Sequence, residues 1–189
     1  MAGVAGQTMR VSAPRATRFL VGLVVGEAVA GLVLAGAVYL AGTLLGVLAP
    51  PSLRLLAVAA AALFFGVADL RGRTPQVSRQ VPRRLAYKLT SGSLGLVWGF
   101  DLGLLFTTQK TVSLLWLSIV GVLLVDPVAA PVALVVWSVV SGTAVVVWAL
   151  VPNSQLRLAQ EQPWIKVAKR ISAVTMMATA VVSVLVVAG

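Results

Sequence analysis

The sequence predicts an all-α integral membrane protein, and three observations lead to that prediction. Hydrophobic residues make up 59% of the 189 residues, charged residues make up only 11%, and the mean hydropathy is +1.01. Soluble domains contain about 45–50% apolar and about 25% charged residues. The apolar residues also gather in six segments, and the polar stretches between them are rich in basic residues. Six such segments predict five or six transmembrane helices.

The first apolar segment, 19–48, is unusually long. Its 30 residues would form a helix of about 45 Å, against a hydrocarbon core of about 30 Å. The helix must therefore tilt, break or project from the bilayer. Arginines precede it as in a signal peptide, but a signal's apolar region has only about 7–15 residues, so we expect an uncleaved first span. We expect residues 1–17 to form a disordered cytoplasmic tail and 18–189 a single transmembrane domain.

The second apolar segment, 53–70, follows a turn at Pro50-Pro51. The polar loop 71–90 comes next and contains no acidic residue. Its bases are Arg71, Arg73, Arg79, Arg83, Arg84 and Lys88. Short loops rich in lysine and arginine stay on the cytoplasmic side, so the sequence predicts a cytoplasmic loop here.

The remaining apolar segments leave the number of crossings open. Two short ones, 93–107 and 112–125, precede two longer ones, 128–151 and 171–188. Six full crossings would put the basic stretch 152–170 outside, against the positive-inside rule. If 93–125 is instead one re-entrant or broken element, 152–170 can lie in the cytoplasm, because irregular backbone is tolerated where protein or water surrounds it.

Two acidic residues lie within apolar segments, and each follows a similar stretch of sequence. Gly22-Leu-Val-Val-Gly26 leads into Glu27, and Gly95-Leu-Val-Trp-Gly99 leads through Phe100 to Asp101. A charged carboxylate in hydrocarbon is costly, so such residues are used or paired. The functional interpretation is a proton- or cation-coupled site. The alternatives for each acid are pairing with a polar group or base of a neighbouring helix, or a position near a membrane face, where a long side chain such as that of Glu27 can reach the interface.

Lys110 is a third candidate because it separates two short apolar segments. It marks an extracytoplasmic turn, or it is the partner of Asp101 or Asp126. Helix spacing places Asp101 about 200° from Gly99, so its helix needs partners on two sides.

Glycines at intervals of four residues predict close helix packing. The candidates are Gly22, Gly26, Gly95, Gly99 and Gly103. In a chain this rich in glycine, packing within the chain is favoured over a dimerisation motif.

The net charge of +10 does not indicate nucleic-acid binding, because the bases cluster at the ends of apolar segments. Candidates for contact with anionic lipid headgroups or other phosphates are Arg79, Arg83, Arg84 and Lys88. The alternative is that these bases only set the topology. The similar stretches 82–88 and 163–169 each begin with proline and carry bases and an aromatic residue, which predicts short interfacial helices.

The absence of cysteine and histidine excludes several kinds of chemistry. Disulfides, thiolate metal sites, bis-histidine haem and an imidazole proton relay all require these residues. No catalytic motif, metal-ligand spacing or phosphate-binding loop is present either. The sequence therefore predicts no metal and no cofactor, and it does not favour an enzyme.

The stretch from Arg79-Gln-Val-Pro82 through Trp98-Gly-Phe-Asp-Leu-Gly103 resembles the small bacterial polytopic proteins of the cytochrome-c-biogenesis (DsbD-type) and sulfite-exporter-type group. Those proteins share a basic loop followed by a glycine-rich helix. The thiol-relay members use intramembrane cysteines, which this chain lacks. The resemblance therefore implies a transport or scaffold role and no electron transfer.

Two function classes follow from these observations. The first is a small transporter, or the membrane subunit of one, in the bacterial plasma membrane, with Asp101 and Glu27 as coupling or substrate contacts. A bias towards Arg, with 11 Arg to 4 Lys, supports a bacterial source. The second is a non-catalytic membrane subunit that anchors or stabilises a larger complex. Both predict contact with lipids and association with a second copy or other subunits.

Overall fold

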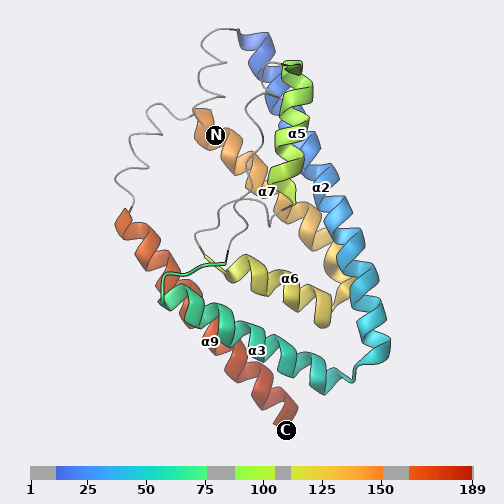
Figure 1. The fold of residues 1–189 in the computed structure, drawn as a ribbon, viewed down its shortest axis with the longest axis vertical. Coiled ribbons are helices and arrows are strands. Elements are labelled where there is room, and N and C mark those ends of the chain that lie inside the picture. The colour runs from blue at the N-terminus through green and yellow to red at the C-terminus, as the bar shows by residue number, and fades with distance from the viewer. Residues whose placement is uncertain (1–11, 76–87, 105–111, 151–161, 189) are drawn as a thin grey trace. The chain divides into compact units, whose positions relative to one another are not determined.

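The structure is a computed structural model that describes residues 12–75, 88–104, 112–150 and 162–188. All regular secondary structure in these ranges is helical, which confirms the predicted all-α class (Figure 1). Four of the described helices are long and apolar enough to cross a membrane. They are α2 (Ala13–Leu48), α3 (Pro51–Leu70), α7 (Ala130–Leu150) and α9 (Gln162–Ala188).

The described residues form two compact units. Unit 1 draws its residues from Met1–Leu34, Val77–Gln109 and Ala133–Glu161. Unit 2 draws them from Ala35–Gln76, Lys110–Val132 and Gln162–Gly189. Helices α2 and α7 contribute residues to both units.

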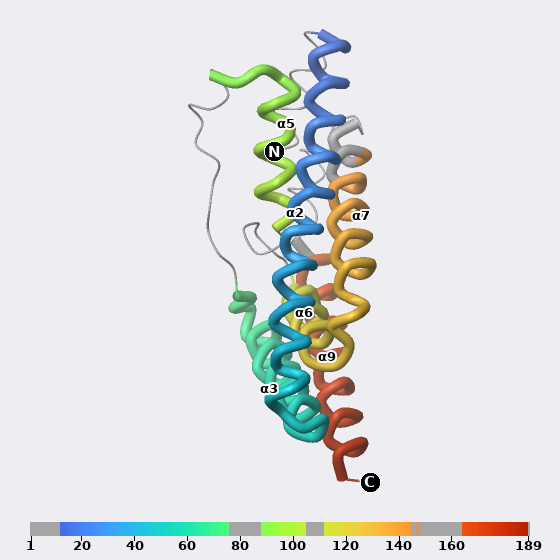
Figure 2. The backbone as a smooth tube through the Cα atoms, turned by 90° about the vertical axis from the view of Figure 1, so that its right-hand side faces the viewer, coloured from blue at the N-terminus to red at the C-terminus, as the bar shows by residue number. Residues whose placement is uncertain are grey.

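Unit 1 contains the first part of α2, the short helix α5 (Ser91–Gly103) and most of α7. Figure 2 shows α5 on one side of α2 and α7 on the other. Phe19 and Leu23 of α2 are buried against Leu94 of α5. The Phe19 ring also meets the Trp98 ring edge to face, with 6.2 Å between ring centroids. Burial of these large side chains stabilises the pairing of α2 with α5.

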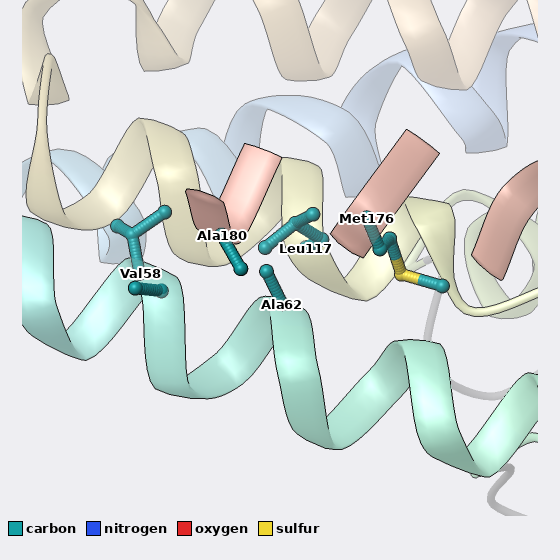
Figure 3. Packing of buried hydrophobic residues seen from close by; sticks show 6 residues of the cluster. Val58, Ala62, Leu117, Met176 and Ala180 are labelled. Atoms are coloured by element: carbon teal, nitrogen blue, oxygen red, sulfur yellow. The ribbon is translucent and has the colours of Figure 1, made fainter. Parts of the chain in front are cut away.

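Unit 2 contains α3, α6 (Leu114–Leu124), the 3-10 turn η1 (Pro127–Ala129) and α9. Its apolar core lies where α3, α6 and α9 meet (Figure 3). The core side chains labelled there are Val58, Ala62, Leu117, Met176 and Ala180. Three of the helices thus share one core.

Helices α3 and α9 run antiparallel in unit 2 (Figure 1). Asp69, near the end of α3, bonds Ser172 near the start of α9, and Val58 near the start of α3 shares the core with Ala180. The separate interfacial helix predicted at 163–169 is wrong, because these residues form the first turns of the continuous helix α9. Proline is compatible with a first helical turn, where the backbone N–H needs no intrahelical acceptor.

Helices α5 and α6 are both too short to cross a bilayer alone. They contain 13 and 11 residues, whereas a span needs about 20. Helix α5 ends at Gly103, within the predicted segment 93–107, and α6 fills most of the segment 112–125. The chain therefore has two half-length apolar helices in this region.

Candidate functional site

Glycines bring α2 and α5 into backbone contact in unit 1. A Cβ atom added at Gly26 would lie 2.7 Å from the Phe100 backbone nitrogen, and one at Gly99 would lie 2.8 Å from the Leu23 Cα. Real Cβ atoms do not approach so closely, so only glycine fits at these positions. All the glycines proposed for helix packing lie at this contact: Gly22, Gly26, Gly95, Gly99 and Gly103. The contact joins two helices of the same chain.

Helix α7 packs antiparallel to α2, and here too glycine makes room. A Cβ added at Gly31 of α2 would lie 3.0 Å from the Ser138 Cβ of α7. A Cβ added at Gly142 of α7 would coincide with the carboxyl group of Glu27. The Glu27 side chain, which is 1% exposed, therefore points from α2 into the surface of α7 at Gly142.

Asp101 is the second buried acid of unit 1, at 6% exposure. It lies in the last turn of α5, two residues before Gly103. A Cβ at Gly103 would lie 2.6 Å from the Glu27 Cα, so the end of α5 is beside Glu27. Both acidic residues have interaction partners in the folded chain. Unit 1 thus holds two buried carboxyl-bearing residues around the end of one short helix.

The end of α5 also receives a hydrogen bond from α7. The Ser138 hydroxyl, which is fully buried, donates to the Gly103 carbonyl oxygen at 3.1 Å. The last carbonyls of a helix have no intrahelical donor, and in an apolar environment an unsatisfied carbonyl is costly. Ser138 therefore lets α5 end inside the protein.

The chemistry of this region favours positive charge. The C-terminal end of a helix carries partial negative charge, which disfavours nearby carboxylates and favours protons or cations. Carboxylate, hydroxyl and carbonyl oxygens are also the ligands that hard cations prefer. Within the described ranges, no group of three or more His, Cys, Asp or Glu residues could hold a metal ion.

The remaining predicted contact residues lie mainly outside the described residues. Lys110 lies there, as do Arg79, Arg83 and Arg84 of the basic loop. Lys88 is described and is exposed just before α5. The structure thus places Glu27 and Asp101 in one unit, and the pairing of Lys110 with Asp101 or Asp126 stays a prediction.

Unit 2 contains a buried carboxylate that the sequence analysis did not select. Asp69 of α3 is 2% exposed and accepts four hydrogen bonds. Its Oδ1 accepts from the Thr74 hydroxyl at 2.9 Å and the Ser113 hydroxyl at 2.6 Å. Its Oδ2 accepts from the Ser113 backbone N–H at 2.8 Å and the Ser172 hydroxyl at 2.9 Å. We name these four residues the Asp69 clasp.

The Asp69 clasp ties three helices together. Ser113 precedes the first residue of α6, so its N–H is one of the donors that a helix start leaves unsatisfied. A carboxylate at this position also meets the positive end of the α6 dipole. In the sequence Asp69 is an acid at the end of an apolar segment, a position that is also typical of a segment boundary. The partners come from distant segments, so no local pattern marks them.

Two further bonds hold the turn after α3. The Lys169 ammonium donates to the Gly72 carbonyl oxygen at 3.2 Å, and the Trp116 indole N–H donates to the Pro75 carbonyl oxygen at 3.0 Å. Gly72 has a φ of 70°, which favours glycine. The start of α9 and the start of α6 therefore both lie against this turn.

Comparisons with protein-family models, with curated proteins and with solved structures give no match.

Proposed function

We propose that this chain is a small membrane transporter, or the membrane subunit of one, that couples to a proton or a cation through Glu27 and Asp101. The observation that carries the proposal is the burial of both residues around the C-terminal end of the short helix α5. In many transporters, half-length helices end near the bilayer midplane, and their C-terminal ends and free carbonyls coordinate Na⁺ or H⁺. A transport role is also what the resemblance to the DsbD and sulfite-exporter group implies.

The short helices α5 and α6 support five crossings. They contain 13 and 11 residues, so each is too short to cross a bilayer by itself. We propose that the segment 93–125 is one broken or re-entrant element, because irregular backbone is tolerated where protein or water surrounds it. Together with α2, α3, α7 and α9 it makes five crossings.

This topology places all the basic stretches on one side. In this topology the starts of α2, α5 and α9 and the ends of α3 and α7 all lie on the same side of the membrane. The loop 71–90 and the stretch 152–170 then both obey the positive-inside rule. We therefore assign both to the cytoplasm of a bacterial cell, with the chain in the plasma membrane. Five crossings are few for an alternating-access monomer, so we expect assembly with a second copy or another subunit.

Proton flux into proteoliposomes tests the coupling role. Purified full-length chain is reconstituted with the pH dye pyranine inside, and a potassium diffusion potential set by valinomycin drives protons inwards. We expect faster acidification than in empty liposomes, and we expect E27Q and D101N to lose this flux. Each substitution removes a group that can take up and release a proton while it nearly conserves side-chain volume.

The matched control is D126N, which removes an exposed carboxylate and keeps an acceptor for the Ala129 N–H. We expect it to behave as the wild-type chain does. Wild-type flux equal to that of empty liposomes would contradict proton coupling. The same assay with a Na⁺ gradient and a Na⁺-sensitive dye would then decide whether a cation takes the proton's place.

The second candidate is a non-catalytic subunit, and the Asp69 clasp favours it. That carboxylate is held by four donors and fixes helices in place, which is what a purely structural protein requires. Native mass spectrometry of the chain extracted from its host separates the two candidates. Other chains bound in fixed ratio support a complex subunit, whereas a monomer or homo-oligomer contradicts it.

A further inference from the structure

Basic residues from two segments distant in sequence lie at one end of unit 2. Arg71 and Arg73 follow α3, and Lys166 and Arg170 lie one helical turn apart in the first turns of α9. All four side chains are exposed. The Lys169–Gly72 bond and the Asp69 clasp hold the two segments together. We name these four residues the α3/α9 basic surface: Arg71, Arg73, Lys166 and Arg170.

Asp69, the acid at this end of unit 2 among the described residues, does not face this surface. Asp69 is buried, and its two carboxylate oxygens accept hydrogen bonds from neutral donors of the clasp. Its charge is therefore directed into the unit. Several positive charges at one surface attract anions most strongly when the local acid is withdrawn from them.

The position of the surface at the end of the apolar helices suits a lipid headgroup. Trp164, in the first turns of α9, is 72% exposed, and Trp116 bonds the Pro75 carbonyl just after Arg73. Tryptophan is enriched at the depth of the headgroups. The positive end of the α9 dipole also lies at this start, which favours an anion.

We propose that the α3/α9 basic surface binds the phosphate of an anionic phospholipid headgroup. The side chains would contact the phosphate, while the acyl chains lie along the exposed apolar residues of α9, including Ile171, Val174 and Val181. A lipid is favoured over a free phosphate because the same helix provides both a basic start and an apolar exposed side. This binding is independent of the transport role.

Native mass spectrometry of the full-length chain in detergent, titrated with phosphatidylglycerol, tests the proposal. We expect the double variant R71Q/R170Q to bind the first phosphatidylglycerol at least tenfold more weakly, because each base near anionic lipid contributes roughly fivefold to binding. The second double variant, R73Q/K166Q, should show the same weakening. Agreement between the two double variants would rule out a folding defect in one variant as the cause. The control is R15Q/R18Q, which removes two exposed bases at the start of α2 in unit 1.

Unchanged binding in both test variants would overturn the proposal. Equal weakening of phosphatidylglycerol binding in R15Q/R18Q would also overturn the proposal, since binding would then depend on the total positive charge of the chain and not on this surface. Titration with phosphatidylcholine should show no difference between the variants. Displacement of phosphatidylglycerol by millimolar inorganic phosphate would show that the surface binds free phosphate, and would overturn the assignment to a lipid.

Discussion

The position of the Glu27 side chain requires glycine at position 142. The Glu27 carboxyl group lies against α7 at Gly142, and a Cβ atom added there would occupy the same space as the carboxyl group. Glu27 is also the most deeply buried acid of the chain among the described residues, at 1% exposure. The pair therefore combines a tight helix contact with a buried acidic group.

We predict that G142A destabilises the chain and displaces Glu27. Overpacking costs about 1–3 kcal/mol in well-packed interiors. The free energy of unfolding can be measured by SDS titration in mixed micelles, followed by tryptophan fluorescence. The matched control is G36A, since a Cβ at Gly36 meets nothing within 4 Å. We expect G36A to be neutral or slightly stabilising, because alanine is favoured over glycine in helices. Equal stability of G142A and the wild type would contradict the packing argument.

Asp69 allows a graded test of the Asp69 clasp. In D69N, the amide oxygen can still accept from the Ser113 N–H, and the amide nitrogen can donate to the hydroxyls, which rotate. We therefore predict a loss of about 1–2 kcal/mol of unfolding free energy in D69N, and of about 3 kcal/mol or more in D69A, which leaves buried donors without an acceptor.

S172A removes one donor from the clasp and should cost about 1 kcal/mol. The same SDS titration gives the order of the three variants. If D69A is no less stable than D69N, the hydrogen bonds of the clasp do not stabilise unit 2.

At the scale of elements, the short helices α5 and α6 explain several polar residues inside apolar segments. A helix that ends in an apolar environment needs side chains to satisfy its terminal backbone groups. Ser138 satisfies the Gly103 carbonyl at the end of α5, and Asp69 satisfies the Ser113 N–H at the start of α6. Arg54 donates to the Leu124 carbonyl at the end of α6, at 3.2 Å. These polar residues satisfy terminal backbone groups of two helices that are each too short to cross a bilayer.

Serines of α7 provide a matched pair for this argument. We predict that S138A costs about 1–3 kcal/mol of unfolding free energy, because it leaves the buried Gly103 carbonyl without its donor. Ser141 donates only to the Ser138 carbonyl of its own helix, at 2.9 Å. S141A should therefore change stability by less than S138A. Thermal denaturation in detergent, followed by circular dichroism, compares the two. Equal effects would mean that the end of α5 does not depend on α7.

For the whole molecule, the absence of cysteine makes topology directly measurable. Single cysteines at R73C, K166C and D126C can be labelled with a membrane-impermeant maleimide in intact cells and in inverted vesicles. We predict that R73C and K166C are labelled from one side and D126C from the other, because α3 and α9 are antiparallel and α6 returns towards the start of α3. Labelling of R73C and K166C from opposite sides would restore six full crossings and contradict the broken crossing.

The local sequence pattern predicted where the helices lie better than it predicted which helices pack against each other. Apolar length and composition gave the helical class and the approximate bounds of the segments, and four-residue spacing marked the glycines between α2 and α5. The continuous start of α9 was not predicted, because a proline, a tryptophan and two lysines in 163–169 are as compatible with the first turns of a long helix as with a separate interfacial helix. Asp69 lies at the end of an apolar segment, where an acid is typical of a segment boundary.

Composition and the spacing of residues along single helices are enough to predict a helical membrane protein with acids at Glu27 and Asp101 and glycines that permit close packing, because these properties are local in the sequence. Which helices pair is known only from the folded chain. Asp69 and Ser172 are 103 residues apart, and their hydrogen bond is what brings the basic start of α9 to the end of α3. Such a pairing depends on the directions of several helices at once. Hydrophobic periodicity is read in windows of about 11–18 residues, and no such window contains both partners.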